Sequence, residues 1–377
     1  MNKTEYGKKS RITLMIHHAL QKQALEVIKS IGCQSVFVES ARTVRIHEKP
    51  TIWTILGFEE PIEDSPTDII RFIVAFDKAE AVALYLINKL DLRIPGRGSV
   101  LAQDIFELGG SDVPDLKMDE SLCKGNVIHD LTMITGIQSF SATGDNISKV
   151  ALRHGAGLPT VSLGKGTGIR DRLGLLRITI TPEKELTYLL VPSFDANGLQ
   201  NMLIEKGKLN RPGGGFMYQT HVNCGLVDPL IRVGNQTQTA SMEQIVAAID
   251  DLKQNTDWRK RTFENSSERI LNSTTTFSHR EISFICPVGH SDDYIQTAMD
   301  GGAAGATLIN MRYISLSDEP RAENKTSTYE NAIMCVKNEE ADKIIDSIIK
   351  LAEEKGEKDW LIQKLPASAI FATYKKK

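Results

Sequence analysis

The segment ISFICPVGHSDDYIQTAMDGGAAGATLINMRYI, residues 282–314, contains the pattern that decides the fold. Residues 282–288 alternate as a short strand does, and Ser291 stands where it can cap a following helix. The glycine-rich run at 301–305 ends this helix, and the apolar residues 306–314 read as a second strand. The segment therefore predicts a strand, a helix and a second strand.

The residues that follow extend this pattern to six elements. After a polar stretch at 315–330, residues 331–336 predict a third strand. Apolar side chains recur at helical spacing over 341–352, Gly356 ends that helix, and residues 360–371 form a last strand. The predicted order is strand, helix, strand, strand, helix, strand.

The same order fits two earlier parts of the chain. Local matches support the alignment, because Gly-Leu-Pro-Thr at 157–160 corresponds to Gly-Ala-Thr at 305–307, and Gly-Cys-Gln-Ser at 32–35 fits with the threonine lost. We therefore predict three related units and a connector that holds one amphipathic helix: unit one (10–112), unit two (126–228), the connector (229–280) and unit three (281–374).

Composition excludes several classes of protein. The 377 residues carry 45 Lys and Arg against 48 Asp and Glu, a net charge of −3, so the basic excess typical of nucleic-acid-binding proteins is missing. No apolar run approaches the ~18 residues that a membrane-spanning helix needs, and the first residues form no apolar leader. The five cysteines are scattered and never spaced C-x-x-C. We expect a cytoplasmic protein, not inserted in a membrane, with reduced thiols.

Two similar glycine turns follow the second helix of units one and two. They read Pro-Gly-Arg-Gly at 95–98 and Pro-Gly-Gly-Gly at 212–215. Glycines after a proline allow positive φ angles, so that consecutive backbone N–H groups can converge on an anion such as a phosphate. The alternative is that each turn only ends a helix before a strand.

Unit two has a second glycine-rich run, Gly-Lys-Gly-Thr-Gly at 164–168, directly after its predicted strand at 160–163. This is not a Walker A loop, because Gly166 separates Lys165 from the threonine. Together with Lys184, just ahead of the next strand, the run could place cations opposite the Pro-Gly turn. A flexible, solvated loop is the alternative.

At these motifs the chain resembles the P-II (nitrogen-regulatory-protein) signalling family. The residues that carry the resemblance are 160–168, 183–186, 212–216 and 95–98. The resemblance implies an α+β fold of tandem ferredoxin-like β-α-β-β-α-β units, arranged as a monomeric pseudo-trimer within one chain. It also implies adenine nucleotides or other small effectors in clefts between units. A long loop between the second and third strands of such a unit reports the ligand state to a transporter, an enzyme or a regulator.

The resemblance assigns ligand-binding positions in units one and two. In unit three, Gly-Glu-Lys-Asp at 356–359 replaces the glycine turn, and its two carboxylates would repel a phosphate. An arginine pair that the family places after the last strand is not visible in any unit, so we expect at most two competent clefts. The assigned residues are Gly96, Arg97, Gly98, Thr160, Lys165, Gly166, Gly168, Lys184, Gly213, Gly214 and Gly215.

The expected function is therefore regulatory, in nitrogen or carbon metabolism, with a nucleotide or small anion as effector and a protein as target. Candidate reporter loops are residues 47–65 in unit one and 315–330 in unit three, whereas unit two has almost none. The apolar and acidic residues of 47–65 are typical either of a loop packed against a neighbouring unit, which we favour, or of a partner-binding tip. We predict no catalytic residue and no metal site, because neither a base nor a carboxylate cluster can be assigned from the sequence. The alternative is a ligand-independent interaction scaffold that retains the fold only.

Overall fold

The computed structural model describes residues 8–46, 62–110, 113, 115–139, 143–168, 183–210, 214–228, 252, 277–317 and 326–372. Most of the predicted loop at 47–65 lies outside the described residues, as does the connector helix except for Leu252. In the described part of the chain, no helix combines the length and the apolar composition that crossing a membrane would require.

Each unit contains four strands and two main helices in the predicted order. Unit one consists of β1 (Lys8–His17), α1 (Gln21–Ser30), β2 (Ser35–Ile46), β3 (Ile62–Ala75), α3 (Ala79–Lys89) and β4 (Gly98–Leu108). Unit two consists of β5 (Ile128–Gln138), α4 (Thr143–Arg153), β6 (Thr160–Gly168), β7 (Glu183–Pro192), α6 (Ser193–Lys206) and β8 (Gly215–Leu226). Unit three consists of β9 (His279–Pro287), α9 (Ser291–Asp300), β10 (Gly305–Ser315), β11 (Thr328–Lys337), α10 (Asn338–Lys355) and β12 (Leu361–Ala372). Short 3₁₀ helices η1 (His18–Leu20), η2 (Phe76–Lys78) and η3 (Glu120–Leu122) complete the described elements.

The strands pair in the same way inside each unit, always antiparallel. In unit one the order is β4-β1-β3-β2, and units two and three repeat it as β8-β5-β7-β6 and β12-β9-β11-β10. The fold is thus a mixture of helices and strands, dominated by a 12-stranded antiparallel sheet.

The edge strands of each unit pair with both other units. Of the second strands, residues 41–43 of β2 pair with 160–162 of β6, 165–168 of β6 pair with 305–308 of β10, and 312–315 of β10 pair with 35–38 of β2. The last strands, β4, β8 and β12, also pair with one another. The three units therefore join in a closed arrangement, in which no unit occupies an end.

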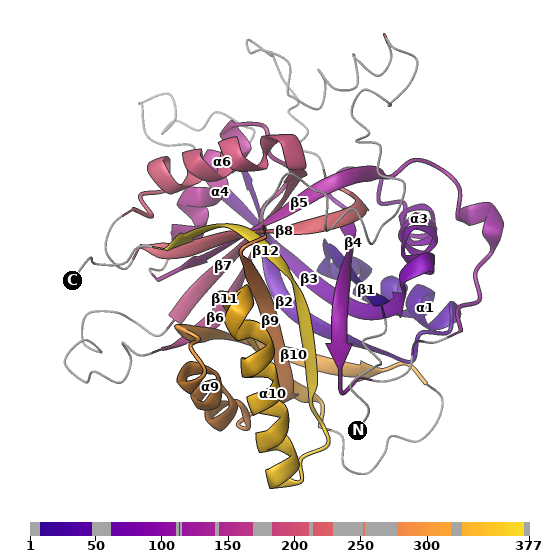
Figure 1. Ribbon diagram of the computed structural model, residues 1–377. Coiled ribbons are helices and arrows are strands. Elements are labelled where there is room, and N and C mark those ends of the chain that lie inside the picture. The colour runs from indigo at the N-terminus through magenta and orange to yellow at the C-terminus, as the bar shows by residue number, and fades with distance from the viewer. Residues whose placement is uncertain are drawn as a thin grey trace.

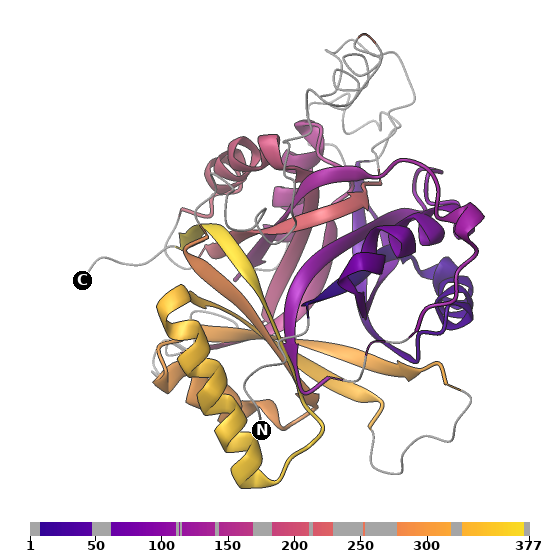
Figure 2. The ribbon, with the colours of Figure 1, turned by 45° about the vertical axis from the view of Figure 1, so that its right-hand side comes forward.

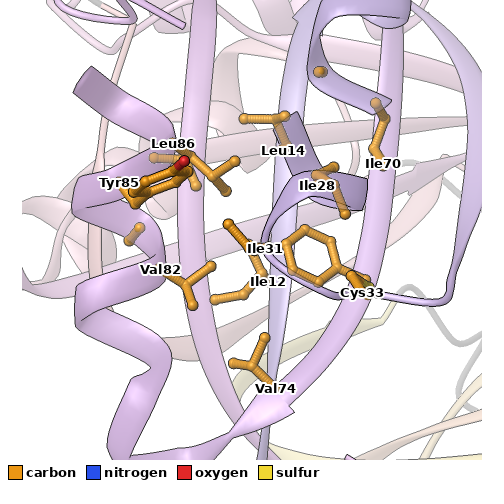
Figure 3. Close-up of a cluster of buried hydrophobic side chains, with 14 of the residues drawn as sticks. Ile12, Leu14, Ile28, Ile31, Cys33, Ile70, Val74, Val82, Tyr85 and Leu86 are labelled. Carbon is orange, nitrogen blue, oxygen red and sulfur yellow. The ribbon is translucent and has the colours of Figure 1, made fainter. Parts of the chain in front are cut away.

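Helices cover the outer side of the strands in three pairs. Figure 1 shows α1 with α3, α4 with α6, and α9 with α10 at separate places around the strands, and Figure 2 shows the same arrangement from a second direction. Under α1 and α3, the alternate β1 residues Ile12, Leu14 and Ile16 are fully buried. Figure 3 shows Ile12 and Leu14 among their neighbours in this core. Equivalent apolar cores lie under the other two helix pairs.

The opposite faces of the sheets enclose a shared interior. A fourth apolar cluster combines residues from all three units, among them Met15, Tyr188 and Ile333. Beside the apolar cluster lie buried charges, which are stable away from water only when they are paired and hydrogen-bonded. Arg71 Nη1 donates to Glu39 Oε2 at 2.5 Å, and both residues belong to unit one.

A second buried pair crosses between units. Arg11 Nη2 of unit one lies 3.6 Å from Glu281 Oε1 of unit three, and Tyr218 of unit two donates its hydroxyl to Glu281 Oε2 at 2.8 Å. Burial lowers the pKa of Arg11, and the Glu281 carboxylate opposes that shift. The Glu281 carboxylate of unit three therefore contacts a side chain from each of the other two units.

Several predicted boundaries are wrong. The third strand of unit one begins at Ile62, inside the expected loop at 47–65. In unit three, the expected loop at 315–330 is shorter than predicted, because Ser315 belongs to β10 and residues 328–330 belong to β11. Ser291 is not the cap of α9, because His290 is the N-cap residue. Glu330 Oε1 instead accepts hydrogen bonds from the backbone N–H groups of Gly289 and Ser291, a contact from another strand that local sequence does not reveal.

We predict that Arg71→Met lowers the free energy of unfolding by about 3–5 kcal/mol, because it leaves the Glu39 carboxylate buried without its counter-charge. Urea denaturation measures the change. Arg312→Met on the exposed face of β10 is the matched control, with an expected change within about 0.5 kcal/mol. Equal effects of the two substitutions would show that the buried pair does not stabilise the interior.

Candidate functional site

The predicted site residues lie at the contacts between units, which we call junctions. Junction one joins units one and two, junction two joins units two and three, and junction three joins units three and one. At junction one, Arg42 Nη2 of unit one lies 2.6 Å from Asp145 Oδ1 and 3.3 Å from Glu185 Oε1 of unit two. These ion pairs link units one and two at junction one.

The turn at 95–98 requires its glycines. Gly96 has φ +82° and Gly98 has φ +138°, values that other residues rarely adopt. A Cβ atom on Gly98 would lie 2.1 Å from the Met15 carbonyl oxygen, too close for any side chain. The positive φ angles predicted for these glycines are confirmed, and they allow the backbone N–H groups of the turn to face one acceptor.

The acceptor is a carboxylate of the neighbouring unit. Gly96 N donates to Asp228 Oδ1 at 2.8 Å, and the N–H of Gly98 also favours the charged form of this carboxylate by lowering its pKa. The Asp228 backbone is held as well, because its N–H donates to Ser99 Oγ at 2.8 Å and its carbonyl accepts from Leu158 N at 3.1 Å. An anion thus occupies the turn, and unit two supplies it.

Arg45 completes the surroundings of this carboxylate. Burial raises the pKa of Asp228, while the N–H groups of Gly96 and Gly98 and the positive charge of Arg45 oppose the rise. Arg45 Nη2 also donates to the Gly96 carbonyl oxygen at 3.3 Å. Since Arg45 is the residue before the end of β2, the glycine turn is connected directly to that end.

Two other predicted residues belong to junction one in different ways. Arg97 does not face the turn's acceptor, because its Nε donates to the Leu90 carbonyl oxygen at 2.8 Å, just beyond the end of α3. Thr160 is buried and pairs with Thr43 across the two units, two residues along the chain from Leu158. Thr160 therefore lies at junction one, close in the chain to Leu158, whose N–H donates to the Asp228 carbonyl oxygen.

The run at 164–168 is a strand and not the flexible, solvated loop of the alternative interpretation. It forms the second half of β6, where Gly166 pairs with Thr307 and Gly168 pairs with Gly305 of unit three. Lys165 is exposed and pairs with Glu183 of β7. The sequence could not reveal that this run is a strand, because its pairing partner β10 lies about 140 residues further along the chain.

Lys184 lies close to Gly166 and to the second glycine turn. A Cβ atom on Gly166 would lie 2.3 Å from Lys184 Cε, so the lysine stem packs over this glycine. Lys184 Nζ donates to Ser139 Oγ at 3.4 Å, and the preceding Gln138 pairs with both Glu185 and Gly215. Lys184 and Gly215 therefore share one end of the unit-two sheet.

The rest of the second turn is less fully described. Gly214 is buried, and Gly213 lies outside the described residues. Gly215 has φ +156°, and a Cβ atom there would lie 2.8 Å from the Ile137 carbonyl oxygen. Junction two thus combines a glycine turn with a lysine, whereas junction one combines a glycine turn with a carboxylate.

Junction three differs from both. Where the other units have a glycine turn, Gly356 ends α10 in the left-handed conformation, and Glu357 Oε2 accepts from the Tyr294 hydroxyl at 2.6 Å. Asp359 Oδ2 accepts from the Tyr329 hydroxyl at 2.6 Å. The carboxylates predicted to repel a phosphate are present, but they are hydrogen-bonded to tyrosines.

A cavity of about 120 Å³ opens beside these residues. Its walls include Phe37 of unit one and Tyr313, Tyr329 and Trp360 of unit three, while Cys33 lies at one side. Burial raises the pKa of the Cys33 thiol to about 11, which keeps it protonated and unreactive near neutral pH. No pattern in the sequence predicts a cavity at the junction where the glycine turn is lost.

Sequence reasoning missed Asp228, Arg45 and the aromatic residues of junction three. The sequence analysis places Asp228 at the last position of unit two and assigns it no role, although its carboxylate accepts from a turn 132 residues earlier in the chain. Arg45 had one usable signal, since it follows Arg42 at the end of a predicted strand. The aromatic residues come from three separate strands and share no local pattern.

We predict that Asp228→Ala lowers the free energy of unfolding by about 1–3 kcal/mol, because buried N–H groups of the glycine turn lose their acceptor. Thermal or urea denaturation checks the value. Asp346→Ala on the exposed side of α10 is the control and should change it by less than about 0.5 kcal/mol. Identical stabilities for the two variants would mean that the carboxylate does not hold units one and two together.

Comparisons with known proteins do not add to this geometry. No protein-family model matches the chain, and none of the curated proteins matches it. The junctions and the repeated pairing of the strands are therefore the basis for the function proposed below.

Proposed function

We propose that this chain is a P-II-like regulatory sensor that binds a small anionic effector between its units and acts without catalysis. In this proposal its three units are ferredoxin-like, and together they form a pseudo-trimer within one chain. The strand order β4-β1-β3-β2, repeated in the other two units, supports this reading. The reciprocal pairing of the edge strands supports the trimer-like arrangement.

The observation that carries the proposal is the carboxylate of Asp228 on the first glycine turn. Backbone N–H groups that converge on a carboxylate can equally donate to phosphate oxygens, because carboxylate and phosphate are both anions with several hydrogen-bond acceptors. An effector with a phosphate group, with an adenine nucleotide as the first candidate, would take the place of Asp228. Its affinity is then set by competition with this internal anion.

Arg45 offers a route by which occupancy of the turn could be reported. It contacts the Gly96 carbonyl oxygen and is attracted to the Asp228 carboxylate. Replacing a monovalent carboxylate by a phosphate changes the charge that faces Arg45 at the end of β2. Residues 47–61, which connect β2 to β3, would carry the change to a protein target: a transporter, an enzyme or a regulator of nitrogen or carbon metabolism.

Junction two is the second candidate position for the same chemistry. Lys184 and Gly215 lie at one end of the unit-two sheet, so a cation and a glycine turn are available there. The remaining predicted residue of this group, Lys165, is exposed on β6. An effector that used both junctions would bind with two sites per chain.

A ligand-independent interaction scaffold is the alternative function, and one observation favours it. The Asp228 carboxylate already satisfies the N–H groups of the glycine turn, so the turn needs no ligand to be stable. In that case the turn is a clamp between units one and two. The two functions differ in what happens when the carboxylate loses its charge.

Titration calorimetry with ATP, ADP, AMP, cyclic AMP and bicarbonate tests the sensor. We predict heat of binding with at least one of them, and at least a tenfold tighter binding to Asp228→Asn, which removes the competing charge while keeping the size of the side chain. Asp346→Asn is the matched control and should leave the affinity unchanged.

The outcomes separate the two functions. Binding that is strengthened by Asp228→Asn and weakened by Arg45→Met would place the effector at junction one. Loss of binding on Lys184→Ala alone would move it to junction two. Absence of heat with every compound, in the natural protein and in Asp228→Asn, would leave the scaffold as the better account.

A further inference from the structure

The cavity of junction three occupies the same place in the repeat as the predicted ligand residues of junction two. Across junction two, Gly166 pairs with Thr307. Across junction three, the equivalent pair is Tyr313 with Phe37, because the pairings inside units two and three and across the two junctions run in the same register. Three residues of unit two thus match three that line the cavity: Gly166 matches Tyr313, Lys184 matches Tyr329, and Gly214 matches Asp359.

These replacements reverse the electrostatic character of the place. Junction two offers the amine of Lys184, whereas junction three offers the uncharged phenol of Tyr329. Gly214 has no side chain, whereas Asp359 brings a carboxylate, whose Oδ2 accepts from the Tyr329 hydroxyl at 2.6 Å. A place that has lost a cation and gained a carboxylate favours a cationic ligand over an anionic one.

The other charged side chains that line the cavity have counter-charges of their own. The pairs are Arg71 with Glu39, Arg11 with Glu281, and Glu107 with Lys9. Among the described residues, no cationic group lies within ion-pair distance of Asp359. The lining residues and their partners therefore leave one uncompensated negative charge, on Asp359.

Aromatic side chains form much of the cavity wall. Phe37, Tyr313 and Tyr329 pack against one another with their ring centroids 5.4–5.7 Å apart. Trp360 lines the same space, and its Nε1 donates to the Glu357 carbonyl oxygen at 3.2 Å, which holds the indole in place. A cation is attracted to an aromatic face when it lies within about 6 Å of the ring centroid, and tryptophan attracts it most strongly.

The size and the walls of the cavity favour a methylated ammonium group over a simple one. A primary ammonium carries N–H groups that need acceptors when they leave water, whereas a quaternary ammonium has none. The volume is about 120 Å³, and a cavity of about 150 Å³ accommodates benzene, which is similar in size to a trimethylammonium head group. A quaternary nitrogen therefore fits the space without leaving a donor unpaired.

We propose that the junction-three cavity binds the trimethylammonium head group of a small soluble compound such as choline. The methyl groups pack against the aromatic wall and Trp360, and Asp359 supplies the opposite charge. This site goes beyond the proposed anion site and does not depend on it, because it lies at another junction and selects the opposite charge. The chain then responds to two ligands of different chemistry.

Calorimetric titration of the full chain with choline tests the site. The comparison is the carbon analogue of choline, in which a quaternary carbon replaces the nitrogen, so that the shape stays and the charge is lost. We expect choline to bind at one site per chain and the carbon analogue to bind roughly tenfold more weakly. Absence of choline binding, or equal affinities for the two compounds, would overturn the proposal. So would equally tight binding to phosphatidylcholine vesicles, because the head group would then come from a lipid surface.

A pair of variants assigns the binding to the cavity. Asp359→Asn removes the charge and keeps an acceptor for the Tyr329 hydroxyl, so it should weaken choline binding roughly fivefold and leave the carbon analogue unaffected. Asp346→Asn on the exposed side of α10 is the matched control and should stay within about twofold of the natural protein. Equal choline affinities for the two variants would refute the assignment.

A third variant tests the aromatic wall. Tyr313→Leu keeps an apolar side chain but removes a ring face, so it should weaken choline binding more than binding of the carbon analogue. Phe194→Leu, at an exposed aromatic residue of unit two, is its control. Equal losses for the two compounds would show that the wall contributes only apolar contact and would contradict the proposal. The anion site is tested separately, because it responds to Asp228→Asn and not to Asp359→Asn.

Discussion

The constraint on which the structure depends is that a four-stranded sheet has two open edges. In each unit these edges are the second and the last strand, and unpaired edges invite association with other chains. Here the second strands, β2, β6 and β10, pair among themselves, and so do the last strands, β4, β8 and β12. Every one of these strands contacts both other units. The edge strands of the three units therefore pair with one another within one chain. These pairings create the three junctions at which the candidate sites lie.

Fusion of the units permits an interior that a symmetric trimer could not have. Three identical subunits would bring three copies of each interior charge together, whereas here Arg11 of unit one meets Glu281 of unit three and Tyr218 of unit two. The same freedom explains why the junctions differ. Junction one holds a carboxylate on its glycine turn, junction two holds a lysine near its turn, and junction three has an aromatic-lined cavity where the glycine turn is lost. Each junction can evolve a separate chemistry.

The sequence predicted what local patterns specify. The threefold order of elements, the end of α10 at Gly356 and the glycine conformations of the turn at 95–98 all follow from periodicity and backbone sterics over a few residues. The features that failed depend on contacts between distant segments. The run at 164–168 is a strand because β10 pairs with it, Glu330 replaces Ser291 as the acceptor at the start of α9, and Asp228 reaches a turn 132 residues away. No local pattern encodes those pairings. Asp228 and Arg45, which complete junction one, could therefore be recognised only from the three-dimensional structure.

Among the described residues, every edge strand of the three units pairs with edge strands of the other two, so one chain closes the assembly. Sedimentation equilibrium over a range of micromolar concentrations tests this closure, because the described strands leave no edge at which a further copy could pair. We expect a single species with the mass of one chain, 41.8 kDa, at every concentration. A stable species near three times 41.8 kDa would contradict it, since the units would then complete their sheets between chains and not within one.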